Sequence, residues 1–343
     1  MRVRSLHARS HSRFCLPFRV FRGQNKIMKF SKVLFILVFL LSSVALHAQK
    51  TQRFIAVTID DLPVVSTRSD LKNRQEITRK LLAHIKKAKV PAIGFVNEIK
   101  LYKNDKRDEA QIDLLRSWIN ANLELGNHTF SHVNIANVPL EKYKEEILKG
   151  EIITKELLQA KGLKMRYFRH PYLWTGLSLE IKSDLGAFLN EHNYTIAPVT
   201  IDNADYIFSR AYDLAFDKND KKLMKEIGKA YIPYIEAKTD YWERQSVKLF
   251  GREVKQTLLL HANFINSDYF DDLAKMYKKR GYKFVTLEEA LKDEAYKLPD
   301  NFVRRNGISW LHRWALDKGK GNILPDEPTV PKFVLEAAGL ESE

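Results

Sequence analysis

The sequence contains one cysteine, Cys15, and this residue lies in an N-terminal stretch that we expect to be removed from the mature protein. A disulfide within the chain is then impossible, so the folded protein has to be held together by its hydrophobic core. About 295 residues remain after the removal, which is enough to bury a sizeable core within a single large domain.

Acidic residues are absent from the first 48 positions. This stretch carries nine of the 57 lysines and arginines and none of the 42 acidic residues, and it contains the apolar run from Val33 to Leu46. The run holds about 14 residues, too few to cross a bilayer as a helix, and it ends in the small residues Ala45 and Ala48. We predict a secretory signal peptide, with Met28 as the true start, and an exported, periplasmic or secreted protein without a stable membrane anchor after cleavage. An uncleaved membrane anchor is the alternative.

A stripe of basic residues that would track nucleic-acid phosphates is also absent. Without the first 48 residues the chain keeps 48 basic and 42 acidic residues, which lowers the net charge from +15 to +6. These charges are interspersed along the chain, as on a solvated surface. The pattern argues against nucleic acid as a partner, and it leaves the oligomeric state open.

From residue 54 onward, short apolar runs alternate with longer amphipathic stretches. The runs predicted as buried strands are Phe54–Ile59, Pro91–Val96, Leu123–Asn127, Met165–Arg169, Thr195–Ile201, Gln256–His261 and Lys283–Leu287. The predicted helices include Leu71–Lys89, Asp108–Ala121 and Leu140–Lys161. Repeated β–α units with buried strands indicate an α/β fold with a parallel sheet, and seven or eight units favour a barrel over an open sheet.

Polar residues recur where these predicted strands end. They are Asp60-Asp61, His128, Arg169-His170, Asp202 and His261. A β/α barrel builds its active site at the carboxyl ends of its strands, so we expect these side chains to share one site.

Two histidines in the stretch Gly126-Asn-His-Thr-Phe-Ser-His132 have the spacing of a metal-binding pair. If a helical turn begins after Gly126, His128 and His132 lie on one face with their imidazoles close together. A third ligand is needed, and the doublet Asp60-Asp61 is the best acidic candidate. An acidic doublet after a strand is also common as a helix cap and first-turn pair, so the doublet alone does not establish a metal site.

The sequence resembles the polysaccharide deacetylases of the NodB-homology type, carbohydrate esterase family 4. Five motifs of this family occur in order: Thr58-Ile-Asp-Asp61, His128-Thr-Phe-Ser-His132, Arg169-His-Pro-Tyr172, Asp202-Asn-Ala-Asp205-Tyr206 and Leu258-Leu-Leu-His261. The resemblance spans roughly residues 54–290. It implies a distorted (β/α)₇ barrel and a divalent metal, usually zinc, that is held by Asp61, His128 and His132.

The chain departs from the family pattern in two places. Ile59 replaces the commoner phenylalanine, and the interval from Asp202 to His261 is longer than we expect. The second departure predicts a helical insertion at about residues 207–255, near the mouth of the site. We therefore expect an extension and signal peptide at 1–48, a deacetylase domain at 49–298, and a tail at 299–343 whose tryptophans pack it against the barrel.

Each motif residue can be given a role in hydrolysis. A divalent cation lowers the pKa of bound water and polarises a carbonyl oxygen. Asp60 would be the general base, and His261 the general acid, oriented by Asp202 or Asp205. The resemblance implies that Arg169 pairs with Asp60 and keeps it ionised. It also implies that the backbone N–H of Tyr172 helps to stabilise the oxyanion, with Pro171 fixing the turn.

The remaining aromatic and histidine residues are ambiguous. Sugar rings could stack on Tyr172, Trp174, Tyr206 or Trp242, although aromatic side chains near apolar segments more often belong to the core. His170 and His192 have no partner in the pattern, and we interpret both as structural or exposed.

The sequence therefore predicts an exported, metal-dependent hydrolase that removes acetyl groups from an N- or O-acetylated carbohydrate. Zinc is the first choice of metal, and cobalt, nickel and iron stay open. One alternative is a small-molecule amide hydrolase on the same barrel: a groove open at both ends would favour a polymer, and a closed pocket a small molecule. The other is a non-catalytic carbohydrate-binding protein, against which the presence of Asp60 and His261 argues.

Overall fold

The strand β1 (Arg53–Leu62) runs through the centre of the protein, because its apolar residues are buried on both faces. It pairs in parallel with β2 (Ile93–Val96), β8 (Gln256–His261) and, at its beginning, β9 (Tyr282–Phe284). The sheet continues from β2 through β5 (Glu124–Asn127) and β6 (Tyr167–Phe168) to β7 (Thr195–Ile196), again with parallel pairing throughout. All seven predicted strands are confirmed.

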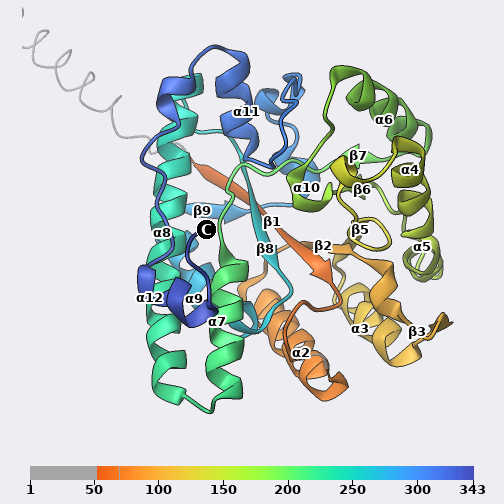
Figure 1. Ribbon diagram of the computed structural model, residues 1–343, viewed down its shortest axis with the longest axis vertical. Coiled ribbons are helices and arrows are strands. Elements are labelled where there is room, and N and C mark those ends of the chain that lie inside the picture. Colours follow the sequence, from red (N-terminus) through yellow and green to blue (C-terminus); the bar gives the residue numbers. More distant parts are fainter. Residues whose placement is uncertain (1–51, 69) are drawn as a thin grey trace, which may run out of the picture. The chain divides into compact units, whose positions relative to one another are not determined.

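The chain that follows β7 closes the sheet into a ring. Ala197, just after β7, donates its N–H to the carbonyl oxygen of Phe168, so the chain is still paired with β6 at this point. A few residues later Ile201 N donates to Thr257 O, and Ile201 forms a parallel bridge with Leu258 in β8. The parallel strands therefore curl back on themselves, and the predicted distorted (β/α)₇ barrel is confirmed (Figure 1).

This computed structural model describes residues 52–68 and 70–343. The predicted signal peptide, the start at Met28 and Cys15 all lie outside the described residues. Among the helices that are described, none combines the length and the apolar character needed to cross a membrane.

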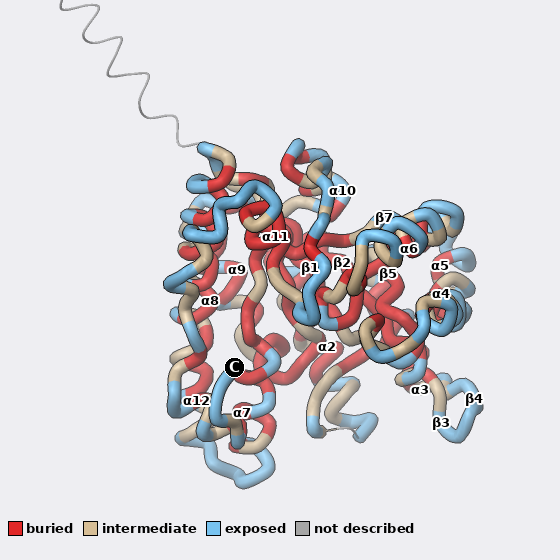
Figure 2. The backbone as a smooth tube through the Cα atoms, turned by 45° about the horizontal axis from the view of Figure 1, so that its top comes forward, coloured by how far each residue is buried: buried red, intermediate tan, exposed pale blue. Residues whose placement is uncertain are grey.

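Helices surround the barrel. Their bounds are α2 (Leu71–Ala88), α3 (Glu109–Asn120), α4 (Leu140–Lys149), α5 (Ile152–Gln159), α6 (Leu179–Glu191), α7 (Asp205–Asp217), α8 (Lys221–Phe250), α9 (Phe264–Lys279), α10 (Leu287–Ala290), α11 (Trp310–Asp317) and α12 (Lys332–Ala338). A small hairpin, β3 (Tyr102–Lys103) and β4 (Lys106–Arg107), lies outside the barrel. Burial follows this arrangement, with the strands and inner helix faces buried and the outer turns exposed (Figure 2).

The predicted helix Leu140–Lys161 is wrong as a single element, because the chain breaks between α4 and α5 at Gly150. A Cβ atom on Gly150 would lie 2.5 Å from the backbone of Thr129, so the chain turns where it presses on the histidine loop. The break is then stabilised from outside, since the carboxylate of Glu98 accepts the N–H groups of Ile153 and Thr154 in the first turn of α5.

Two long helices occupy the interval in which the insertion was predicted. Helices α7 and α8 run side by side along one flank of the barrel, and the turn that joins them is exposed (Figures 1 and 2). The C-terminal residues return to this flank, where α12 packs against α7 and α11 against α8. Trp310 and Trp314 of α11 are buried.

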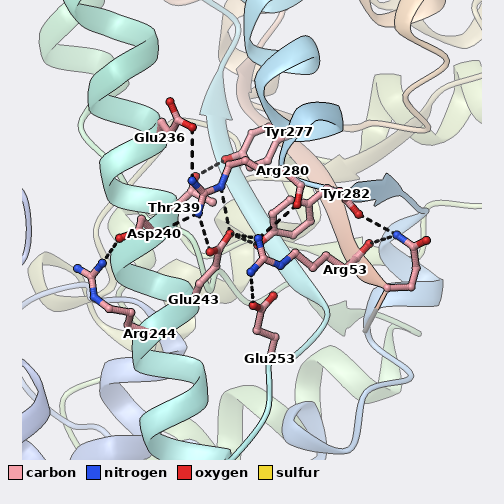
Figure 3. A network of polar contacts seen from close by, with 12 residues as sticks. Arg53, Glu236, Thr239, Asp240, Glu243, Arg244, Glu253, Tyr277, Arg280 and Tyr282 are labelled. Atoms are coloured by element: carbon pink, nitrogen blue, oxygen red, sulfur yellow. Dashed lines mark hydrogen bonds and ion pairs between the residues drawn. The ribbon is translucent and has the colours of Figure 1, made fainter. Parts of the chain in front are cut away.

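A network of charged and polar side chains lies at the amino ends of β1 and β9 (Figure 3). The carboxylate of Glu243 on α8 accepts a hydrogen bond from Arg280 at 2.6 Å and one from the Tyr282 hydroxyl at 3.0 Å. Arg53, the first residue of β1, lies 3.4 Å from the same carboxylate and 2.7 Å from that of Glu253. The network therefore joins α8 to the beginnings of β1 and β9.

Candidate metal centre and active site

The two aspartates at the end of β1 face the same pocket because the strand is irregular there. In a regular strand, successive side chains point to opposite faces of the sheet. The register of β1 against β2 shifts between Ile59 and Leu62, and Asp61 adopts a φ of 66°. This irregularity breaks the alternation of side chains, so Asp60 and Asp61 both line one pocket at the mouth of the barrel.

The helical turn that would have placed His128 and His132 on one face does not form. The segment after β5 is not helical, and Thr129 and His132 have φ values of 64° and 57°. Side chains supply the bonds that a helix would have used: Asn127 Oδ1 accepts the Thr129 N–H, and Glu146 accepts the N–H and hydroxyl of Ser131. The loop still brings the two imidazole rings to a centroid distance of 4.8 Å.

Asp61, His128 and His132 form a set of three metal-ligand candidates, with ligand atoms that all lie within 4.8 Å of one another. Asp61 Oδ1 is 3.5 Å from His132 Nε2 and 3.7 Å from His128 Nε2. Ligands of a tetrahedral zinc ion at its usual bond lengths are roughly 3.3 Å apart, so a small inward movement would complete the site. Asp61 Oδ1 is buried and has no hydrogen-bond partner among the described residues, as expected for an atom that faces a cation.

The protonation of the histidines suits the same role. His128 Nδ1 lies 2.8 Å from the carbonyl oxygen of Arg169, which can only accept, so the proton is on Nδ1 and the lone pair of Nε2 points to the site. Burial lowers the pKa of His128 well below its usual value and also lowers that of His132. Both rings are therefore neutral ligands, and the residues present fit a zinc-type metal.

Lys100 supports the candidate metal ligand, and sequence reasoning missed it. Its ammonium group donates to the main-chain carbonyl oxygen of Asp61 at 2.7 Å and lies 4.0 Å from Asp61 Oδ1. Burial acts to raise the pKa of Asp61, but Lys100 and His132 outweigh burial and hold this pKa well below its usual value. Lys100 belongs to no motif, and its position a few residues past the end of β2 was the one available signal.

Asp60 lies beside the metal-ligand set, against the guanidinium of Arg169. Asp60 is 2% exposed, and its Oδ2 is 3.5 Å from Arg169 Nη1 and 3.8 Å from His128 Nε2. Burial raises the pKa of Asp60 to about 6, against the opposing charge of Arg169, so the arginine favours ionisation but does not dominate. Asp60 Oδ1 is buried without a partner among the described residues, which leaves it free to accept a proton.

Across the pocket, His261 is held by Asp205. Its Nδ1 is 2.7 Å from Asp205 Oδ1, and Asp205 Oδ2 accepts the backbone N–H of His261 and the amide of Asn266. Burial acts to lower the pKa of His261, but Asp205 outweighs it and raises this pKa to about 9. The choice that the sequence left open between two carboxylates therefore falls to Asp205.

Asp202 lies in the pocket wall instead. Its carboxylate accepts the N–H of Asn203 at 2.9 Å, and burial raises its pKa to about 6, with Lys238 opposing. Trp242 lies behind this residue, is 1% exposed and donates its indole N–H to the carbonyl oxygen of Asp202. Trp242 belongs to the core, as the sequence favoured for aromatic side chains near apolar segments, and it is not available to stack on a sugar ring.

The pocket has a volume of about 560 Å³ and collects most of the predicted site residues. It is lined by Asp60, Asp61, Val65, His128, His132, His170, Tyr172, Leu173, Trp174, Asp202, Asn203, Tyr206, Leu259, His261 and Gly307. Tyr172 and Tyr206 are more than half exposed, and Tyr172 has a φ of 56° in the turn that Pro171 begins. Two aromatic faces therefore border the opening.

The two histidines without a motif partner have structural surroundings. His170 is buried in the wall of the pocket, where burial lowers its pKa to about 3, and its Nδ1 lies 3.4 Å from the hydroxyl of Tyr143. His192 ends α6 and contacts the carbonyl oxygen of Phe188 through Nδ1 at 2.9 Å. The structural interpretation of both residues agrees with these contacts.

Comparison with known proteins finds a family match over part of the chain. Residues 47–189 match the model described as polysaccharide deacetylase. The peptidoglycan-N-acetylglucosamine deacetylase of Bacillus cereus is 29% identical over 152 residues, which are 44% of this chain and 46% of that protein. The chain thus matches less than half the length of this curated relative.

Solved structures with a similar chain course include two from other bacilli. The peptidoglycan deacetylase PdaC from Bacillus subtilis has 21% sequence identity and a TM-score of 0.45, with 71% of this chain and 93% of that chain covered. BA3943 from Bacillus anthracis, described as a CE4 family pseudoenzyme, has 16% identity and a TM-score of 0.47, with 71% and 66% covered.

Proposed function

We propose that this protein is a metal-dependent hydrolase that removes acetyl groups from an N- or O-acetylated carbohydrate, since residues 47–189 match the polysaccharide deacetylase model. One observation carries the proposal. The metal-ligand set Asp61, His128 and His132 lies in the same pocket as Asp60 and His261, which pair with the buried side chains of Arg169 and Asp205. These are the parts that acyl hydrolysis needs: a site for a Lewis acid, a base and an acid.

The catalytic roles follow from the free atoms of each residue. When bound to Asp61, His128 and His132, a divalent cation would acidify the attacking water and polarise the acetyl carbonyl. Asp60 Oδ1, which has no other partner among the described residues, takes the proton of the water. Before this proton transfer, Arg169 stabilises the ionised carboxylate of Asp60.

His261 acts at the other end of the reaction. His261 Nδ1–H donates a hydrogen bond to Asp205, so Nε2 is the nitrogen that passes a proton to the departing amine or alcohol. The backbone N–H of Tyr172 is assigned to the oxyanion, and the exposed faces of Tyr172 and Tyr206 to a sugar ring. Trp174 lines the same wall.

The substrate and the location are inferred from the relatives and the leader. The curated relative is named a peptidoglycan-N-acetylglucosamine deacetylase, so we take N-acetylated cell-wall sugars as the first substrates to test. Such glycans lie outside the cytoplasm, which agrees with the predicted signal peptide. Two nitrogen ligands and one carboxylate suit zinc, with cobalt, nickel and iron as alternatives.

The test is acetate release by the zinc-loaded mature protein. Chitooligosaccharides, peptidoglycan fragments and acetylated xylan are incubated with wild type, with Asp60→Asn, and with protein treated with a chelator. We expect acetate from wild type alone, and return of activity when zinc is added back to the chelated protein. A protein that binds zinc and these sugars but releases no acetate from any of them would instead be a carbohydrate-binding protein.

A further inference from the structure

We propose, on the basis of the proposed function, that the pocket takes the terminal acetylated sugar of a saccharide and not an internal sugar of a polymer. The feature that points to this substrate is a wall that the C-terminal residues add to the mouth of the barrel. We call Gly307–Arg313 the tail strap. A polymer that runs across a barrel mouth needs a way out on two sides, and the tail strap occupies one of them.

The tail strap lies directly against the turn that contains Tyr172. A Cβ atom on Gly307 would lie 1.7 Å from the carbonyl oxygen of Tyr172, so only glycine allows this approach of the two backbones. Gly307 also lines the pocket, as does Tyr172. The tail strap is therefore part of the wall of the site.

Hydrogen bonds hold the tail strap across the gap between the loop after β6 and the chain after β7. On the β7 side, Trp310 N donates to Val199 O at 2.8 Å, and the Ser309 hydroxyl donates to Thr200 O at 2.8 Å. On the β6 side, the guanidinium of Arg313 donates to Leu173 O, and to Thr175 Oγ1 at 2.9 Å.

The anchoring residues make the closure rigid. Ser309 and Arg313 are buried, and Arg313 also pairs with Asp300 at 2.9 Å. Lifting the tail strap would break these hydrogen bonds and the Arg313–Asp300 ion pair together, so it cannot move away cheaply to let a chain pass. We therefore treat the β6–β7 side of the mouth as closed when substrate binds.

The adjoining wall is fixed from behind by the long helix α8. Trp242 Nε1 donates to Asp202 O at 2.8 Å, and the Tyr234 hydroxyl accepts the N–H of Ala204 at 3.0 Å. Tyr206 follows on this wall, with its ring 6.3 Å from that of His261. The wall and the tail strap together bound a pocket of about 560 Å³, within the range of sites for small ligands.

Asp202 gives this wall a polar group suited to a chain end. Among the described residues its carboxylate accepts one hydrogen bond, from Asn203, so it retains capacity for further donors. A terminal sugar has a free hydroxyl group at a position where an internal sugar forms a glycosidic bond. We assign Asp202 to the recognition of these hydroxyls and not to the acid–base step.

The experiment follows the position at which acetyl groups are lost. Chitooligosaccharides and acetylated xylooligosaccharides, each as a disaccharide, tetrasaccharide and hexasaccharide, are treated with the zinc-loaded mature protein and mapped by mass spectrometry. We expect loss at one terminal sugar per chain and a kcat/KM per chain that changes little with length. Loss of acetyl groups at internal sugars of the hexasaccharide would overturn the inference while leaving the proposed function intact. Absence of acetate from every substrate would overturn the proposed function itself.

A pair of variants tests the assignment of Asp202. Asp202→Asn should raise KM about tenfold, by the same factor for the disaccharide and the hexasaccharide, with kcat little changed, since a charged acceptor for a hydroxyl is lost. The matched control is Asp217→Asn, at the exposed end of α7, which should leave both constants unchanged. A fall in kcat with unchanged KM in Asp202→Asn would return this residue to the chemical step and contradict the assignment.

Discussion

The two ends of β1 carry similar charged groups in opposite circumstances. At the amino end, the carboxylate of Glu243 is shared by Arg53, Arg280 and Tyr282, so that each charge has a partner (Figure 3). At the carboxyl end, buried atoms lack hydrogen-bond partners among the described residues. They are Asp60 Oδ1, Asp61 Oδ1, Arg169 Nε, Arg169 Nη1 and His170 Nε2.

The difference separates stability from function. A buried polar atom without a partner costs folding free energy, and a ligand or a reaction can supply the missing partner. A saturated network offers nothing to a ligand but stabilises the elements that it joins. The charge network at the amino end therefore stabilises the barrel, whereas the groups proposed to react lie at its carboxyl end.

The largest effect should come from His128→Ala. The loss of this ligand is expected to abolish stoichiometric zinc binding and to lower acetate release by a factor on the order of 10⁴ or more, because both functions of the cation disappear. Zinc should also raise the midpoint of thermal unfolding of wild type but not of the variant. Zinc content by metal analysis and the two melting curves are the measurements, and full zinc content in His128→Ala would remove this residue from the site.

His261→Ala should keep its zinc and slow amide hydrolysis by about 10² to 10⁴, the usual contribution of a positioned acid. An activated aryl acetate should suffer much less, because its leaving group departs without a proton. Both rates are measured on one preparation of the variant. Equal losses on the two substrates would argue that His261 acts in oxyanion stabilisation or in structure.

A matched pair of substitutions compares the two ends directly, since each neutralises one buried carboxylate next to an arginine. Glu243→Gln should destabilise the fold by about 2–3 kcal/mol, because two arginines lose a shared partner, and should leave kcat unchanged. Asp60→Asn should abolish activity, retain zinc and change stability far less, because it removes a buried charge that lacks full compensation. Urea unfolding and acetate release on both variants test this, and an equal loss of stability would break the contrast between the two ends.

The smallest expected effect is that of Lys100→Met. The side chain keeps its length but no longer donates to the carbonyl oxygen of Asp61, so the left-handed conformation of that ligand is less well fixed. We expect zinc affinity to fall about tenfold and to recover in Lys100→Arg. Calorimetric titration with zinc measures both, and unchanged affinity in Lys100→Met would limit this lysine to a structural role.

Local chemistry accounts for what the sequence alone determined. The sequence showed the apolar run of β1, the polar residues at the strand ends and the five motifs. Each of these features depends on residues that are close together in the chain. The strand pattern predicted the parallel barrel, and the resemblance carried by the motifs implied the set Asp61, His128 and His132. No helical turn forms between the histidines, because the side chains of Asn127 and Glu146 accept the N–H groups of the loop. The spacing of the two histidines does not reveal these hydrogen bonds.

Contacts between distant segments decided the rest. The ring of the barrel closes through Ile201, His261 is oriented by Asp205 and not by Asp202, and Trp242 is buried in the core. The positions of Lys100 against Asp61 and of Gly307 against Tyr172 join segments with no shared pattern. Side-chain type and spacing specify which chemistry a chain can carry out, but only packing in three dimensions determines which of several equivalent residues meets its partner.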